Sequence, residues 1–292
     1  MKKLIAFISF IIYILFLSGC SAQQGPSTDV LATTKPVYDF TSYLCLGTDI
    51  TVHQLVTENV SCLHDYTLQS QQMRTIESAK LIVISGAGLE EFLHDVLHNS
   101  ENIIDASSEI ELMCGEHNHE TEEGHHHDSD PHIWLSVKNA RHMAENIYYG
   151  LSESFPEYQT VFQNNLITLQ EKFDQLEAYG REQLSSLSTY NIITFHDGFS
   201  YFAEEWNLTI LKALEEESGS EASAAELIEL IHIVQQYQLP AIFTEENGSS
   251  SAAHIIASET GIDIYTLNMG MSDKDYFEIM YQNIDTVKEA LG

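Results

Sequence analysis

Residues 79–90, Ala-Lys-Leu-Ile-Val-Ile-Ser-Gly-Ala-Gly-Leu-Glu, contain a short apolar run rich in β-branched side chains. Similar runs recur at helix-length intervals along both halves of the chain, which is the pattern of strands alternating with helices. The expected strands are residues 30–34, 51–56, 81–85 and 102–105, then 191–195, 208–213, 241–244 and 263–267. This alternation predicts an α/β fold of two lobes, each with a mostly parallel, four-stranded sheet.

One long helix is predicted between the lobes. Apolar residues occur at Phe162, Leu166, Leu169, Phe173 and Leu176 and again at Leu184 and Leu187. This 4-3-4-3 spacing places them in one stripe, and about four heptads are too few to favour a coiled coil. The predicted domains are therefore an N-terminal lobe over residues 30–153, an interlobe helix over 154–188 and a C-terminal lobe over 189–292.

The N-terminus predicts export. Lys2 and Lys3 precede an apolar run over residues 4–17, which favours a signal peptide over a spanning helix. Leu17-Ser18-Gly19-Cys20 resembles a bacterial lipobox, so we expect residues 1–20 to be a lipoprotein signal with Cys20 as the lipidated residue. Residues 21–29 then form a polar tether, and the protein is expected outside the cytoplasm, lipid-anchored to the outer face of the bacterial cell membrane.

The charge balance argues against one class of partner. The chain has 12 Lys and Arg against 44 Asp and Glu, with a formal net charge of −32. Binding to a phosphate backbone requires a basic surface, so nucleic acid is not expected as a partner.

Three histidines in distant segments predict a metal site. His64, His132 and His196 each lie where an extended or turning segment ends, and Asp65 and Asp197 follow two of them as candidate orienting partners. Neutral imidazole suits Zn²⁺, whereas manganese favours oxygen donors, so zinc is the preferred ion.

Several segments together resemble a known family. They are the lipobox, Val30-Leu-Ala-Thr-Thr, residues 79–90, Asp130-Pro-His-Ile-Trp-Leu-Ser, the long helix, Phe195-His-Asp-Gly-Phe-Ser-Tyr-Phe and Ile242-Phe-Thr-Glu. Across the chain from Val30 onward, this pattern resembles the zinc- and manganese-binding lipoproteins of ABC importers, the cluster that includes the ZnuA and AdcA type proteins. The resemblance implies two lobes bridged by one helix, a metal ion in the cleft between them, and delivery to an ABC permease and its ATPase.

The resemblance also assigns ligands. His64, His132 and His196 match the first, second and third ligand positions, with His64 and His132 expected from one lobe and His196 from the other. The fourth position, usually Asp or Glu, is Asn268 here. Because an amide is a poor zinc donor, Glu245 is the candidate either for the fourth ligand or for a residue behind the ligands.

A second histidine cluster lies between the first two ligand positions. Residues 117–128 read His-Asn-His-Glu-Thr-Glu-Glu-Gly-His-His-His-Asp, with no apolar residue that could join a core. We expect a loop over 115–129 that collects metal weakly, as zinc members of the family often have. Its candidate ligands are His117, His119, His125, His126 and His127.

The expected function is capture of Zn²⁺, as cargo, by a monomeric binding protein that is not an enzyme. An exported zinc hydrolase with Glu245 as its base is one alternative, and a manganese-binding lipoprotein or adhesin is another. With Cys20 assigned to lipid, the pairing of Cys45, Cys62 and Cys114 stays open, and Cys62 is also a candidate soft ligand beside His64.

Overall fold

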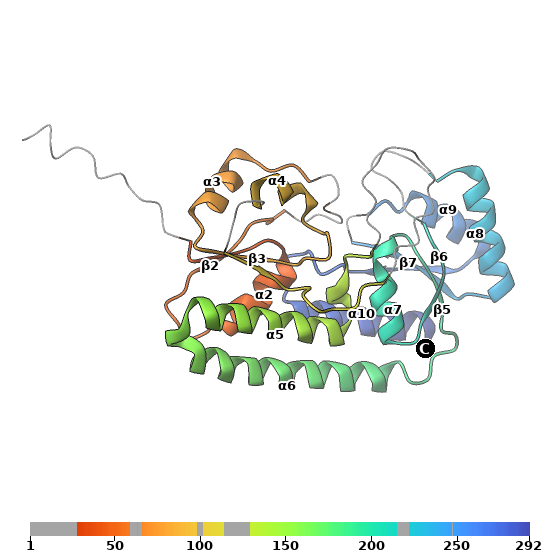
Figure 1. Ribbon diagram of the computed structural model, residues 1–292. Helices are drawn as coiled ribbons and strands as arrows, with labels where there is room; N and C mark the ends of the chain where they lie inside the picture. Colours follow the sequence, from red (N-terminus) through yellow and green to blue (C-terminus); the bar gives the residue numbers. More distant parts are fainter. Residues whose placement is uncertain are drawn as a thin grey trace, which may run out of the picture.

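Two parallel sheets, one in each half of the chain, form the framework of the protein (Figure 1). The computed structural model describes residues 28–58, 63, 66–97, 102–113, 129–214, 222–246 and 248–292. In these segments, no helix combines the length and the apolar content that crossing a membrane requires.

The N-terminal sheet has the order β2-β1-β3-β4, with every pair parallel. Its strands are β1 (Val30–Ala32), β2 (Val52–Gln54), β3 (Leu81–Ile84) and β4 (Ile103–Asp105). The central strands β1 and β3 are buried almost throughout, as expected for strands covered by helices on both faces.

The C-terminal sheet repeats this order as β6-β5-β7-β8, again parallel. Its strands are β5 (Asn191–Thr194), β6 (Thr209–Ala213), β7 (Ala241–Glu245) and β8 (Asp263–Leu267). The predicted fold class is confirmed, since all eight expected strands are present and each lies within two residues of its expected limits.

Helices connect successive strands and cover the sheets. The α-helices are α2 (Lys35–Leu44), α3 (Ser70–Ser78), α4 (His94–Leu97), α5 (Val137–Ser154), α6 (Gln159–Gln183), α7 (Ser200–Glu205), α8 (Ala224–Tyr237), α9 (Ser251–Thr260) and α10 (Tyr276–Leu291). Short 3-10 turns are η1 (Glu91–Leu93), η2 (Ile133–Leu135), η3 (Pro156–Tyr158) and η4 (Asp197–Phe199). Local sequence sets several ends: Ser223 and Glu226 form a capping box on α8, and Gly261 ends α9 with φ of 77°.

The predicted long helix is α6, which runs along the bottom of the molecule below α5 (Figure 1). It is shorter than predicted because Pro156 starts a separate 3-10 turn after Phe155 leaves helical geometry. The apolar stripe faces inward, with Phe162, Leu169, Phe173 and Leu176 buried.

The two lobes share a continuous core rather than meeting only at a hinge. The Phe40 ring of α2 lies 4.8 Å from the Tyr276 ring of α10, and both pack edge-on against Phe173 of α6. In the same region, Lys35 Nζ binds Asp39 at 2.6 Å, and Asp39 accepts a hydrogen bond from the Tyr276 amide at 2.9 Å. The Asp39 carboxylate therefore satisfies the first backbone N–H of a helix in the opposite lobe.

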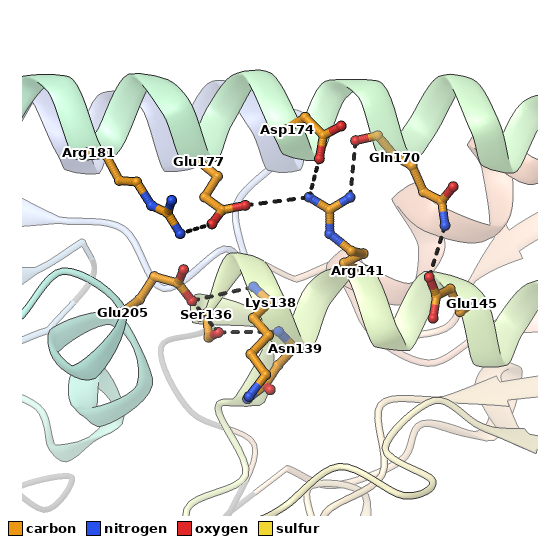
Figure 2. Close-up of polar contacts among 10 residues, drawn as sticks. All are labelled: Ser136, Lys138, Asn139, Arg141, Glu145, Gln170, Asp174, Glu177, Arg181 and Glu205. Carbon is orange, nitrogen blue, oxygen red and sulfur yellow. Dashed lines mark hydrogen bonds and ion pairs between the residues drawn. The ribbon is translucent and has the colours of Figure 1, made fainter.

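Polar contacts hold α5 against α6 (Figure 2). Arg141 reaches Asp174 at 2.7 Å and Glu177 at 3.7 Å, and Gln170 donates to Glu145 at 2.9 Å. Exposed ion pairs of this kind contribute about 0.2–1 kcal/mol each, so the buried apolar stripe is the larger stabilising contribution.

Candidate metal centre

The sheet topology brings particular residues to one edge of the C-terminal lobe. In the order β6-β5-β7-β8, the chain leaves β5 and β7 in opposite directions, and ligands of open α/β sheets bind at such switch points beyond the strand carboxyl ends. His196 follows β5 by two residues, and Glu245 is the last residue of β7. Both side chains are therefore delivered to this edge by adjacent strands.

His196 is buried, with 6% of its surface exposed, and Glu245 lies against it. Glu245 Oε2 is 3.5 Å from His196 Nδ1. In metal sites, a carboxylate beside one imidazole nitrogen orients the ring and increases the basicity of the other nitrogen, so a metal bound by His196 would be expected at Nε2.

His132 has the same kind of partner, supplied locally by Asp130. Asp130 Oδ1 accepts from the His132 amide at 2.9 Å and lies 2.8 Å from His132 Nδ1. Burial raises the pKa of the Asp130 carboxyl, but the contacts with His132 outweigh it, so the pKa lies below its usual value. The carboxylate stays ionised at neutral pH and orients the ring with Nε2 available.

The two imidazoles lie side by side. Their ring centroids are 5.2 Å apart and their planes make an angle of 85°. With Zn–N bonds near 2.0–2.1 Å, each ring centre of a zinc ligand lies about 3.2 Å from the ion, and a tetrahedral angle then separates two ring centres by about 5.2 Å. The spacing of His132 and His196 therefore fits two ligands of one tetrahedral ion.

A glycine makes this approach sterically feasible. A Cβ atom at Gly198 would lie 2.8 Å from His196 Cδ2, 2.9 Å from His132 Nδ1 and 2.4 Å from Met269 Cε. All three distances are shorter than ordinary van der Waals contact, so a side chain here would displace the histidine pair. Gly198 thus belongs to the site although it supplies no ligand.

Comparison with known proteins shows the family of the chain. The family model for ZnuA, the periplasmic component A of the zinc-uptake complex, matches residues 30–290. The chain belongs to this family. The resemblance inferred from the sequence motifs is therefore confirmed.

Individual relatives agree. The zinc-binding lipoprotein AdcA of Streptococcus pneumoniae (strain ATCC BAA-255 / R6) is 28% identical over an alignment 296 residues long, which covers 94% of this chain and 58% of AdcA. A crystal structure of ZnuA superposes with a TM-score of 0.80 at 26% identity, covering 91% of this chain and 100% of that chain. Zn(II)-bound AdcA from S. pneumoniae gives a TM-score of 0.77 at 26% identity, over 91% of this chain and 58% of that one. This chain therefore spans less than two thirds of the length of AdcA.

Asn268, at the position where ZnuA-like proteins are expected to carry a carboxylate, has a role in its own loop. Its Oδ1 accepts from the Gly270 amide at 2.7 Å, and its Nδ2 donates to Ser272 Oγ at 3.0 Å and to the Glu246 carboxylate. These contacts use both polar ends of the amide to shape the turn after β8.

The other predicted site residues fall outside the described part of the chain. These are His64, the loop histidines His117, His119, His125, His126 and His127, the lipidation residue Cys20, and also Asp65, Cys62 and Cys114. Among the residues that the structure does describe, no group of three or more His, Cys, Asp or Glu side chains is arranged to hold a metal. The structure thus brings together His132 and His196, and it places Glu245 against His196.

Sequence reasoning missed two contributors to this site. In the sequence, Asp130 stands out only as the first residue of the Asp-Pro-His-Ile-Trp motif, whereas Asp65 and Asp197 are the expected orienting partners. Its position two residues before His132 was the available signal, because an Asp side chain bonds readily to the backbone amide two residues on. Gly198 gave no comparable signal, since its neighbours His132 and Met269 are remote in sequence.

Proposed function

We propose that this protein captures Zn²⁺ outside the cytoplasm and hands it to an ABC permease whose ATPase drives import. The observation that carries the proposal is the buried pair His132 and His196, with ring centroids 5.2 Å apart and a carboxylate beside each Nδ1. Membership of the ZnuA family and similarity to a protein named as a zinc-binding lipoprotein support it.

Zinc is proposed over manganese on the chemistry of the donors. Two imidazole nitrogens are present, and His64 is proposed as a third. Nitrogen ligands suit zinc, whereas manganese favours oxygen donors and higher coordination. We propose water for the remaining position, because the Asn268 amide is occupied within its own turn.

The proposed site requires neutral imidazoles. Metal binding by histidine competes with protonation, so zinc affinity is expected to fall steeply below about pH 6. In the proposed role, the histidines of residues 117–127 collect zinc weakly.

Lipid anchoring and the transport partners complete the proposal. The Leu17-Ser18-Gly19-Cys20 segment supports lipidation at Cys20, which would keep the protein at the membrane that holds the permease. The sequence contains no Gly-x-x-x-x-Gly-Lys-Ser/Thr nucleotide loop, so ATP hydrolysis is assigned to the partner subunit. The named relatives are binding proteins, which agrees with a non-enzymatic role.

The proposal is tested by metal content and titration. Protein purified from its native envelope should contain zinc, and His64→Ala, His132→Ala and His196→Ala should each weaken zinc binding strongly in a competition assay with a chromogenic chelator. His254→Ala, an exposed histidine on α9, is the matched control and should bind as the parent does. Manganese bound as tightly as zinc, or three variants with unchanged affinity, would overturn the proposal.

A further inference from the structure

The segment that carries His132 lies in the N-terminal half of the chain but is bonded mainly to the C-terminal lobe. We infer that His132 and His196 form one preformed half of the metal site on the C-terminal lobe, and that Tyr201 and Tyr276 position His132 there. This inference rests on the proposed function, and it revises the expectation that His132 pairs with His64 on one lobe and faces His196 across the cleft.

Tyr201 holds the segment before His132. Its hydroxyl donates to the Asp130 carbonyl at 3.0 Å and accepts from the Met113 amide at 2.9 Å. Asp130 in turn binds the ring and the amide of His132. Tyr201 is the second residue of α7, which begins four residues after His196, so the helix that follows one histidine bonds the segment before the other.

Tyr276 holds the segment after His132. Its hydroxyl donates to the Trp134 carbonyl at 2.8 Å, and Trp134 Nε1 donates to the Met269 carbonyl at 2.7 Å. Tyr276 begins α10 and Met269 follows β8, so both partners belong to the C-terminal lobe. The centroid of the Trp134 ring lies 5.5 Å from that of the His132 ring, so the anchored indole packs directly against the imidazole.

Glu205 anchors the start of α5 in the same way (Figure 2). Its carboxylate accepts from Ser136 Oγ at 2.6 Å and from the Lys138 amide at 3.4 Å. Glu205 is the last residue of α7, so this helix bonds the chain both before His132, through Tyr201, and after it, through Glu205.

The segment also contacts the N-terminal lobe, and α5, which follows it, packs against α2 and β4. Asp130 donates its amide to the Met113 carbonyl at 3.0 Å, but the Met113 amide is itself bound by Tyr201.

The consequence concerns metal capture. If both imidazoles are held by groups of the C-terminal lobe, their centroid spacing of 5.2 Å is set before an ion arrives. The ion would then meet two nitrogen donors that are already in position.

A double-mutant cycle tests the role of Tyr201. Tyr201→Phe removes only the hydroxyl and should weaken zinc binding about fivefold in the full chain, the loss expected for one buried hydrogen bond. The same factor should appear in a His64→Ala background, whereas it should disappear in a His132→Ala background because Tyr201 acts through His132. Tyr190→Phe, which removes a donor to the Leu184 carbonyl away from the site, should leave zinc affinity unchanged.

The outcomes separate the two proposals. If His132→Ala and His196→Ala bind zinc as the parent does, the proposed metal site itself is wrong. If they weaken binding but Tyr201→Phe has no effect, or has the same effect with and without His132, the inference about Tyr201 is wrong. Should Tyr201→Phe fail to fold, Tyr276→Phe gives the same test from the other side of His132, with the same expected loss.

Discussion

Gly198→Ala probes the histidine pair without touching a ligand. The added methyl carbon would lie 2.8 Å from His196 Cδ2 and 2.9 Å from His132 Nδ1. Restoring ordinary contact of about 3.4 Å moves each ring by about half an ångström, which exceeds the ~0.2 Å tolerance of a zinc–ligand bond. We expect zinc affinity to fall about 10- to 100-fold, equivalent to about 1.4–2.8 kcal/mol.

The matched control for this variant is Gly180→Ala on α6. A Cβ atom at Gly180 would lie 2.3 Å from a Trp206 ring carbon, and histidines are not among its three nearest atoms. Both variants should lose about 1–3 kcal/mol of stability through overpacking, measured by denaturant unfolding of the metal-free proteins. Only Gly198→Ala should lose zinc affinity in the chelator competition assay. A folded Gly198→Ala protein that binds zinc as tightly as the parent would refute the proposed placement of the ion.

Three further predictions follow from the buried polar groups. Asp130→Asn keeps an oxygen for both His132 contacts but removes the negative charge. Zinc affinity should therefore fall about tenfold in the chelator competition assay. An unchanged affinity would contradict an orienting role for Asp130. Burial raises the pKa of Glu90 to about 7, above its ordinary 4.5, despite hydrogen bonds from Thr33 and the Ser85 amide. Because the pKa of Glu90 is higher in the folded state than in the unfolded state, the protein loses stability as pH rises from about 4.5 to 7. Over that range, the unfolding free energy of the parent should fall by about 3 kcal/mol relative to that of Glu90→Gln, as measured by denaturant unfolding at both pH values. Parallel stability profiles for the two proteins would contradict the raised pKa. Burial also raises the pKa of the Cys45 thiol to about 12, so the reactive thiolate is scarce in the folded protein. Iodoacetamide at pH 8 should therefore label Cys45 only after unfolding, as measured by peptide mass spectrometry. Rapid labelling of the folded protein would disprove this prediction.

The limits of sequence reasoning are clearest at Glu245. It is a candidate from the sequence because Asn268 is a poor zinc donor, and the sequence leaves open whether Glu245 binds metal directly. The pairing of β5 with β7 brings Glu245 Oε2 to 3.5 Å from His196 Nδ1. Sheet order therefore decides that these two side chains meet, and sheet order depends on long-range packing that local patterns do not report.

The amino-acid sequence alone determined the eight strands, the long helix and the histidines worth testing. These features follow from local periodicity and from the side-chain chemistry of single residues. Tertiary structure alone decided which groups hold those histidines. Tyr201 lies 71 residues from Asp130, and Tyr276 lies 142 residues from Trp134. Such contacts form only when separate helices pack together, so no local pattern could identify the phenols that fix His132 beside His196.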